Sequence, residues 1–183
     1  AHLLLARAMI QAGNLASAES ELGVLQRIMP DNELVHLTMG DLHWAKGDRT
    51  RSRAAYQKAF QLQPDSTDAL LGLTRADLAE RRFDAARARV ADRLARTPDD
   101  PAALVLAGRT YMTAGDAPRA EQALRHALDV DPRNLDAYNT LAAIYVTQNR
   151  LDEALAEYRR VADEQPRAAV PATTMVGVVL SLQ

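Results

Sequence analysis

Small and apolar residues recur at every third or fourth position along this chain, in short segments that polar turns separate. One segment, 101–114, carries Leu104, Ala107, Gly108 and Tyr111 at this spacing, and the next, 118–130, carries Ala120, Leu124 and Ala127. This spacing places the residues on one face of an α-helix. Gly115 between the segments fits a left-handed turn after a helix end, and Pro101 and Pro118 fit first-turn positions. The pattern predicts two antiparallel helices joined by a short turn.

The same pattern repeats along the whole chain with a period of 34 residues. Its clearest mark is a proline that closes each unit, at Pro30, Pro64, Pro98, Pro132 and Pro166. A fixed period of this length indicates stacked copies of one helical unit, in which each copy buries its apolar face against its neighbours. We therefore expect one all-α solenoid over residues 1–183, divided into 1–32, 33–66, 67–100, 101–134, 135–168 and 169–183.

In this pattern the chain resembles the tetratricopeptide repeat (TPR) family, whose 34-residue unit reads W-x2-L-G-x2-Y, then A-x3-F, then P. The corresponding positions of one unit hold His36, Met39, Gly40, His43, Gly47, Ser52, Tyr56, Ala59 and Pro64. The resemblance implies a right-handed superhelical solenoid of stacked antiparallel helix pairs, in which the first helix of each pair lines a concave groove. It also implies that 1–32 is an N-terminally clipped repeat and that 169–183 is the first helix of an incomplete repeat.

By this resemblance, three sets of equivalent first-helix residues should face the groove. The first set is Leu3, Leu37, Leu71, Val105 and Asn139, the second is Arg7, Asp41, Arg75 and Arg109, and the third is Ile10, Trp44, Leu78 and Met112. Contiguous apolar surface usually marks a binding site, and arginine pairs with carboxylates. We expect the groove to bind an extended or helical peptide that carries apolar residues and some carboxylates. The alternative is that these apolar residues only pack the first helices against one another.

Leucine fills the groove positions where the family's clamp for heat-shock-chaperone termini needs lysine, so that ligand is disfavoured. His36 and His43 lie seven residues apart on one helical face, which raises the question of a metal or general-base role. Further ligands would have to converge on the same face. Because both histidines stand where the family has aromatic residues, we interpret them as packing residues.

The charge balance restricts the class of partner. The chain has 22 basic and 24 acidic residues, so a nonspecific nucleic-acid or membrane-surface binder, which would carry a basic excess, is disfavoured. It has no cysteine, and no phosphate-binding loop, nucleophile elbow or zinc-type histidine pair. We therefore expect a non-catalytic scaffold without metal or cofactor. The arginine and alanine bias is typical of a bacterial array from a GC-rich genome, and the compartment, cytoplasm or periplasm, stays open.

Repeat 67–100 departs most from the family pattern. Asp77 stands in place of an aromatic residue, Arg81 in place of the turn glycine and Arg93 in place of alanine. One interpretation is drift at tolerant positions. The other is compensation, because a buried carboxylate needs a partner and Arg81 is one helical turn away. We expect Asp77 to form an ion pair with an arginine, and Arg81 is the first candidate.

Segment 169–183 is apolar on nearly every face, whereas an end cap needs a polar outer face. We expect Met175, Val176 and Val179 to be the residues that a following second helix would cover. This face favours a second function, in which the array is a structural spacer that self-associates through 169–183. A weaker alternative is binding of an anionic polymer, polysaccharide or RNA, through Trp44 and the arginine set.

Overall fold

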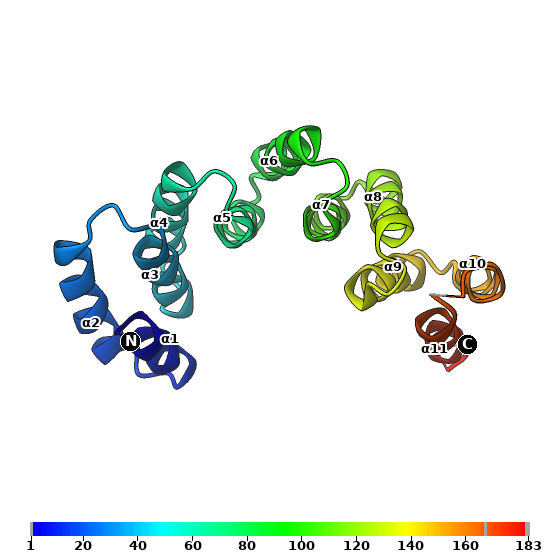
Figure 1. Cartoon of the computed structure of the whole chain (residues 1–183), viewed down its shortest axis with the longest axis horizontal. Coiled ribbons are helices and arrows are strands. Elements are labelled where there is room, and N and C mark those ends of the chain that lie inside the picture. The colour runs from blue at the N-terminus through cyan, green and yellow to red at the C-terminus, as the bar shows by residue number, and fades with distance from the viewer. Residues whose placement is uncertain (1, 167, 182–183) are drawn as a thin grey trace. The chain divides into compact units, whose positions relative to one another are not determined.

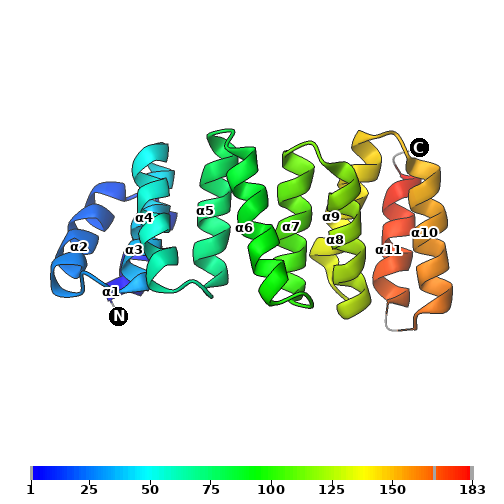
Figure 2. The same cartoon turned by 90° about the horizontal axis from the view of Figure 1, so that it is seen from above.

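The computed structural model of the protein describes residues 2–166 and 168–181. Over these residues the chain forms eleven α-helices and no strand. The helices are α1 (His2–Gln11), α2 (Leu15–Ile28), α3 (Glu33–Ala45), α4 (Arg49–Leu62), α5 (Thr67–Ala79), α6 (Phe83–Arg96), α7 (Pro101–Thr113), α8 (Ala117–Val130), α9 (Leu135–Thr147), α10 (Leu151–Glu164) and α11 (Ala169–Leu180). From α1 to α10, short turns join each helix to the next (Figures 1 and 2).

By the contacts among its residues the chain divides into two compact units. Unit 1 comprises residues 1–89 and unit 2 comprises residues 90–183. The division into six repeat segments over a single array stays a prediction. Within each unit, neighbouring helices pack against one another in chain order, and first helices also contact first helices, as α1 does with α3 and α3 with α5.

The turn inside each helix pair places one residue in the left-handed region of φ. These residues are Gly13, Gly47, Arg81, Gly115 and Asn149, with φ of 76°, 78°, 59°, 78° and 56°. At Gly47 the turn is closed by two backbone hydrogen bonds, from Gly47 to Trp44 at 3.0 Å and from Asp48 to His43 at 2.9 Å. This is the Schellman arrangement, which favours glycine at its left-handed position. The turn geometry therefore keeps the 34-residue period even at Arg81 and Asn149, where glycine is absent.

Arg81→Gly is expected to raise the free energy of unfolding by about 1 kcal/mol, because a left-handed residue with a Cβ costs roughly that amount. Urea unfolding followed by far-UV circular dichroism measures the change. Asn149→Gly is the matched control and should gain less, because asparagine tolerates this region better than arginine. An Arg81→Gly variant no more stable than the wild type would contradict the strain argument.

Four first helices begin at a polar cap that recurs with the same period. Asn32, Ser66, Asp100 and Asn134 each accept a hydrogen bond from the backbone N–H three residues further on. Such a cap contributes about 1 kcal/mol to helix stability. A proline lies two residues before each cap, and proline is common after a helix end because it cannot continue the helix. Each proline of the 34-residue period thus follows the end of one helix, and the cap two residues later begins the next helix.

One of the hydrophobic clusters of unit 1 packs around Tyr56 of α4, which is fully buried. Its ring faces two glycines: an added Cβ would lie 2.4 Å from the ring at Gly40 of α3 and 2.6 Å at Gly72 of α5. A side chain at either position would overlap the ring, so α3 and α5 approach Tyr56 as bare backbone. In unit 2, Gly108 has the corresponding role, because a Cβ there would lie 2.5 Å from Leu124.

Helix α11 buries the face that was expected to stay open. Met175 and Val179 are 5% and 0% exposed, because α11 packs on α9 and α10. The expectation that these two residues await a further helix is therefore wrong, and Val176 is half-buried. The large apolar residues that α11 exposes are Val170, Val178 and Leu180.

Candidate functional site

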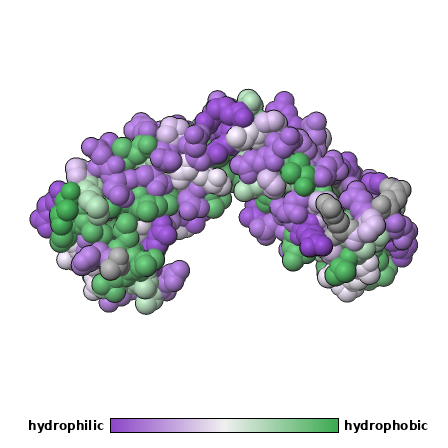
Figure 3. Space-filling model, viewed as in Figure 1, coloured by the Kyte–Doolittle hydropathy of each residue, from purple (hydrophilic) through white to green (hydrophobic). Residues whose placement is uncertain are grey.

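A pocket of about 430 Å³ opens on unit 1 between three first helices. It is lined by Arg7, Ile10 and Gln11 of α1, Leu37 and Asp41 of α3, and Asp68, Leu71, Gly72 and Arg75 of α5. Six of these are among the residues assigned to the groove from the sequence, namely Arg7, Ile10, Leu37, Asp41, Leu71 and Arg75. We call this site the α1–α3–α5 pocket. In the space-filling view, apolar surface gathers over α1, α2 and α3 of the same unit (Figure 3).

The floor of the pocket is apolar, and its side chains differ in how far they are exposed to solvent. Leu37 is 4% exposed and belongs to the core cluster around Tyr56, whereas Leu71 is 46% exposed. Ile10 is half-buried and packs on the α1–α3 core. Leu37 therefore serves packing first, while Leu71 presents free apolar surface to an incoming side chain. The packing interpretation therefore holds for Leu37, and the binding interpretation stays a prediction for Leu71.

The polar side of the pocket is organised by the hydroxyl group of Tyr56. This hydroxyl donates to Oδ1 of Asp41 at 2.7 Å and accepts from Nη2 of Arg75 at 2.5 Å. Arg75 Nη2 also lies 3.5 Å from the same Asp41 oxygen. Burial and the hydrogen bond to Asp41 raise the pKa of Tyr56 well above its usual range, so the hydroxyl stays protonated and keeps donating. The Asp41–Arg75 pair is therefore held in place from the core.

Trp44 of α3 lies next to this pair, and two arginine side chains contact its ring. The guanidinium carbons of Arg49 and Arg75 lie 3.7 Å and 4.2 Å from the centre of its ring. These are cation–π distances. A polymer that stacked a sugar or a base on the indole would have to displace an arginine, so this arrangement weighs against polymer binding through Trp44.

The other groove candidates lie as follows. In unit 1, Leu3 and Leu78 are half-buried, and Leu3 packs on the α1–α3 core. In unit 2, Val105 is 6% exposed, Met112 is half-buried, and Asn139 is exposed. Arg109 forms an ion pair with Asp136 at 3.1 Å and donates to Thr140 at 3.4 Å.

Three lining residues were missed from the sequence. Gln11 is four residues after Arg7, Asp68 is three residues before Leu71, and Gly72 directly follows Leu71. Residues three and four apart share one helix face, so this spacing could have identified Gln11 and Asp68. The spacing does not identify Gly72, because adjacent residues of a helix do not share a face.

Asp77 forms ion pairs with arginines, as expected, but Arg81 is not among its partners. Asp77 is fully buried, its Oδ1 lies 2.8 Å from Nε of Arg53, and its Oδ2 lies 2.8 Å from Nε of Arg89. Arg82 adds a third contact at 3.4 Å. Arg81 occupies the left-handed turn position, where the helix has ended and i to i+4 pairing no longer applies. The two nearest partners come from α4 and α6, and Arg82 comes from the turn before α6.

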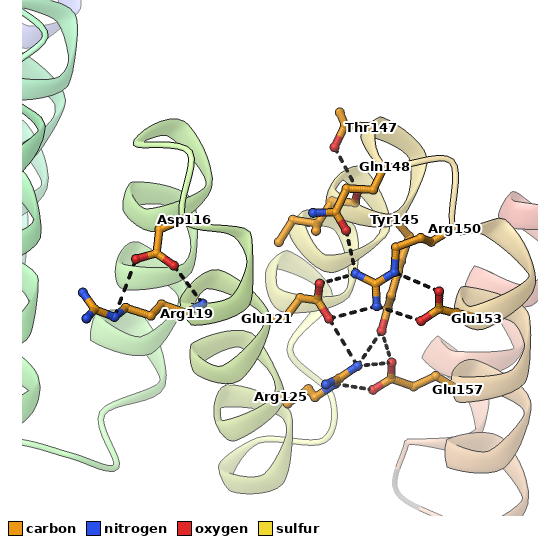
Figure 4. Close-up of polar contacts among 11 residues, drawn as sticks. Asp116, Arg119, Glu121, Arg125, Tyr145, Thr147, Gln148, Arg150, Glu153 and Glu157 are labelled. Carbon is orange, nitrogen blue, oxygen red and sulfur yellow. Dashed lines mark hydrogen bonds and ion pairs between the residues drawn. The ribbon is translucent and has the colours of Figure 1, made fainter.

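A second polar network in unit 2 uses the same repeat positions, 68 residues further on (Figure 4). Arg125 binds Glu157 through Nε at 2.8 Å and Nη2 at 3.0 Å, and its Nη2 donates to Tyr145 at 2.9 Å. Tyr145 donates to Glu157, and Arg150 binds Glu121. Burial alone would raise the pKa of Glu157, but the hydrogen bonds from Arg125 and Tyr145 lower it. The network connects α8, α9 and α10.

The two networks match position by position. Tyr145 corresponds to Asp77, while Glu121, Arg125 and Glu157 correspond to Arg53, Gln57 and Arg89. The residue types differ, yet both sets join a second helix, the following first helix and the next second helix. Their shared place at the junction between helix pairs indicates a structural role.

His36 and His43 are both buried in unit 1. His36 is 7% exposed and its Nε2 lies 2.6 Å from the carbonyl oxygen of Pro30, while His43 is 9% exposed. Burial lowers the pKa of His43, which favours its neutral form. Across residues 2–166 and 168–181, no three histidine, aspartate or glutamate side chains are grouped so that they could hold a metal ion. In the same residues, no helix has both the length and the apolar character needed to span a membrane.

A family model described as tetratricopeptide repeat matches residues 43–109 and 111–172. The chain is 37% identical over 73 residues to cellulose synthase operon protein C of Escherichia coli K12, which is 40% of this chain and 6% of that protein. It is 31% identical over 151 residues to cellulose synthase operon protein C of Xanthomonas axonopodis pv. citri, which is 78% of this chain and 10% of that protein. The chain thus spans a tenth or less of the length of these relatives.

Solved structures of similar fold cover nearly the whole chain. A thermophilic TPR protein of Thermus thermophilus is 18% identical with a TM-score of 0.70, over 98% of this chain and 97% of that one. Yeast Tom70 is 17% identical with a TM-score of 0.69, over 100% of this chain and 40% of that one. At these identities the likeness shows the fold alone.

Proposed function

The chain belongs to the tetratricopeptide repeat family, and we propose that its α1–α3–α5 pocket binds a segment of a partner protein. Its all-α TPR solenoid fold confirms the expectation from the sequence. Proteins of this family generally mediate protein–protein interactions and are typically non-catalytic scaffolds. The observation that supports this pocket in particular is the convergence of three first helices on apolar surface bordered by charges.

The size of the pocket limits the affinity it can supply alone. A volume of about 430 Å³ accommodates one or two side chains. Burying one large apolar side chain contributes roughly 1.5–3 kcal/mol, whereas a micromolar complex needs about 8 kcal/mol. A bound segment must therefore also contact the neighbouring first-helix surface, as an extended or helical peptide would.

Leu71→Glu is expected to weaken peptide binding by about ten- to a hundredfold, because it removes apolar contact area from the floor of the pocket. The probe is a set of peptides selected from a random display library on the full 183-residue chain, with calorimetry as the measurement. Leu135→Glu is the matched control, because Leu135 is 58% exposed on α9, outside the pocket. Peptides whose affinity is equal for both variants would contradict the proposal.

Self-association through 169–183 is the second candidate, and it is favoured by the exposed Val170, Val178 and Leu180 of α11. Sedimentation of the chain without peptide distinguishes the two functions. The names of the bacterial relatives also suggest that a natural partner be sought among the proteins of a cellulose synthase operon.

A further inference from the structure

Two of the four charged side chains that line the α1–α3–α5 pocket compensate each other. Asp41 and Arg75 lie 3.5 Å apart and share the hydroxyl group of Tyr56. Arg7 and Asp68 are different: neither forms an ion pair with any residue that the structure describes. The one side-chain hydrogen bond of Arg7 within the described residues runs from Nε to Thr38 at 3.4 Å, which leaves its two terminal nitrogens for a ligand.

Unit 2 shows what the compensated arrangement would be. Arg109 and Asp136 occupy the repeat positions of Asp41 and Asp68, 68 residues further on, and they form an ion pair at 3.1 Å. In unit 1 the arginine of this pair is replaced by Asp41, which instead pairs with Arg75. Asp68 is therefore left without the cation that its counterpart has. Its place in the first turn of α5 favours that helix, but does not neutralise the carboxylate.

The two free charges lie on opposite sides of the apolar floor. Arg7 is on α1 and Asp68 is on α5, and α3 contacts both helices and lies between them. Neighbouring helix axes are about 8–10 Å apart, so the two backbones are separated by roughly 20 Å. That distance equals about six residues of an extended chain, and the reach of the side chains shortens it.

We propose that the pocket selects a protein segment in which one acidic and one basic residue flank an apolar residue. The acidic residue binds Arg7, the basic residue binds Asp68, and the apolar residue lies on Leu71. This specificity rests on the proposed function of the pocket. A segment with two acidic residues would bring its second carboxylate towards Asp68, which repels it.

The test uses one peptide sequence that was selected for binding to the full chain. Three versions of it differ in the two residues that flank the apolar residue: one acidic and one basic residue (the mixed peptide), two acidic residues, or two basic residues. The wild type is expected to bind the mixed peptide about tenfold more tightly than either other peptide. Asp68→Lys should shift the preference to the acid–acid peptide, and Arg7→Glu should shift it to the base–base peptide. The double variant should repel both charges of the mixed peptide and should prefer a fourth peptide in which the acidic and the basic residue exchange places.

Asp68→Asn and Arg7→Gln remove each charge without reversing it, and circular dichroism shows whether each variant keeps its helices. These two variants should bind the mixed peptide more weakly by a few-fold. Each should also stop distinguishing acidic from basic residues at the peptide position that faces the substituted side chain. If peptides depend on Leu71 but their preference is the same in all variants, the charge rule is wrong and the pocket still binds peptides. If no selected peptide depends on Leu71, both proposals are wrong.

Discussion

Asp77→Ala is expected to lower the free energy of unfolding of unit 1 by about 3–5 kcal/mol. Asp77 is fully buried, and its two carboxylate oxygens each lie 2.8 Å from an arginine Nε, of Arg53 and of Arg89. Without the carboxylate, the guanidinium groups of Arg53, Arg82 and Arg89 would lose the anion that they share, and Glu80, 3.8 Å from Nε of Arg53, would compensate that charge only in part. Breaking a buried ion pair from one side costs more than the pair contributes, because it leaves a desolvated charge.

Trp44 is the one tryptophan of the sequence and lies in unit 1, so its fluorescence during urea unfolding reports on this unit. Asp84→Ala is the matched control, because Asp84 is an exposed aspartate of the same repeat that pairs with Arg87 at 3.3 Å on the surface. The control should change stability by no more than about 0.5 kcal/mol. Similar losses in the two variants would show that the buried network does not stabilise unit 1.

The sequence predicted that Asp77 needs an arginine but not which arginine supplies the contact. The expectation of Arg81 used the spacing rule inside one helix. The actual partners, Arg53 and Arg89, lie 24 and 12 residues away on neighbouring helices. Contacts of this kind depend on how second helices pack against the following first helix, which the sequence period does not specify.

The helices, turns and caps could be predicted from the sequence, because each depends on local residues that recur with the period. The pocket could be predicted only in part. The period identified which first-helix residues are equivalent, yet Leu37 is 4% and Leu71 is 46% exposed at equivalent positions. The difference in depth comes from packing: Leu37 belongs to the cluster around Tyr56. Asp68 likewise lacks an ion-pair partner among the described residues because the repeat position that holds Arg109 in unit 2 holds Asp41 in unit 1.

Tyr56 joins the core of unit 1 to the pocket, so two substitutions at this position should separate stability from binding. Tyr56→Ala is expected to lower the free energy of unfolding by about 3–5 kcal/mol, because the ring fills the space between Gly40 and Gly72. Tyr56→Phe keeps the ring and removes the hydroxyl group, at a cost of about 1–2 kcal/mol. Urea unfolding followed by the fluorescence of Trp44 measures both values.

Tyr56→Phe should nevertheless weaken peptide binding, because the lost hydroxyl group is what holds Asp41 and Arg75 together at the edge of the pocket. Once released, Arg75 can turn towards Asp68 or solvent, and the charge pattern that a ligand meets is no longer fixed. Tyr158→Phe is the matched control: Tyr158 holds the corresponding position in unit 2, its hydroxyl donates to the carbonyl oxygen of Tyr138 at 3.2 Å, and its loss should leave peptide affinity unchanged. If Tyr56→Phe binds peptides as the wild type does, the contact of Arg75 with Trp44 is sufficient to position Arg75, and the hydroxyl group contributes to the core alone.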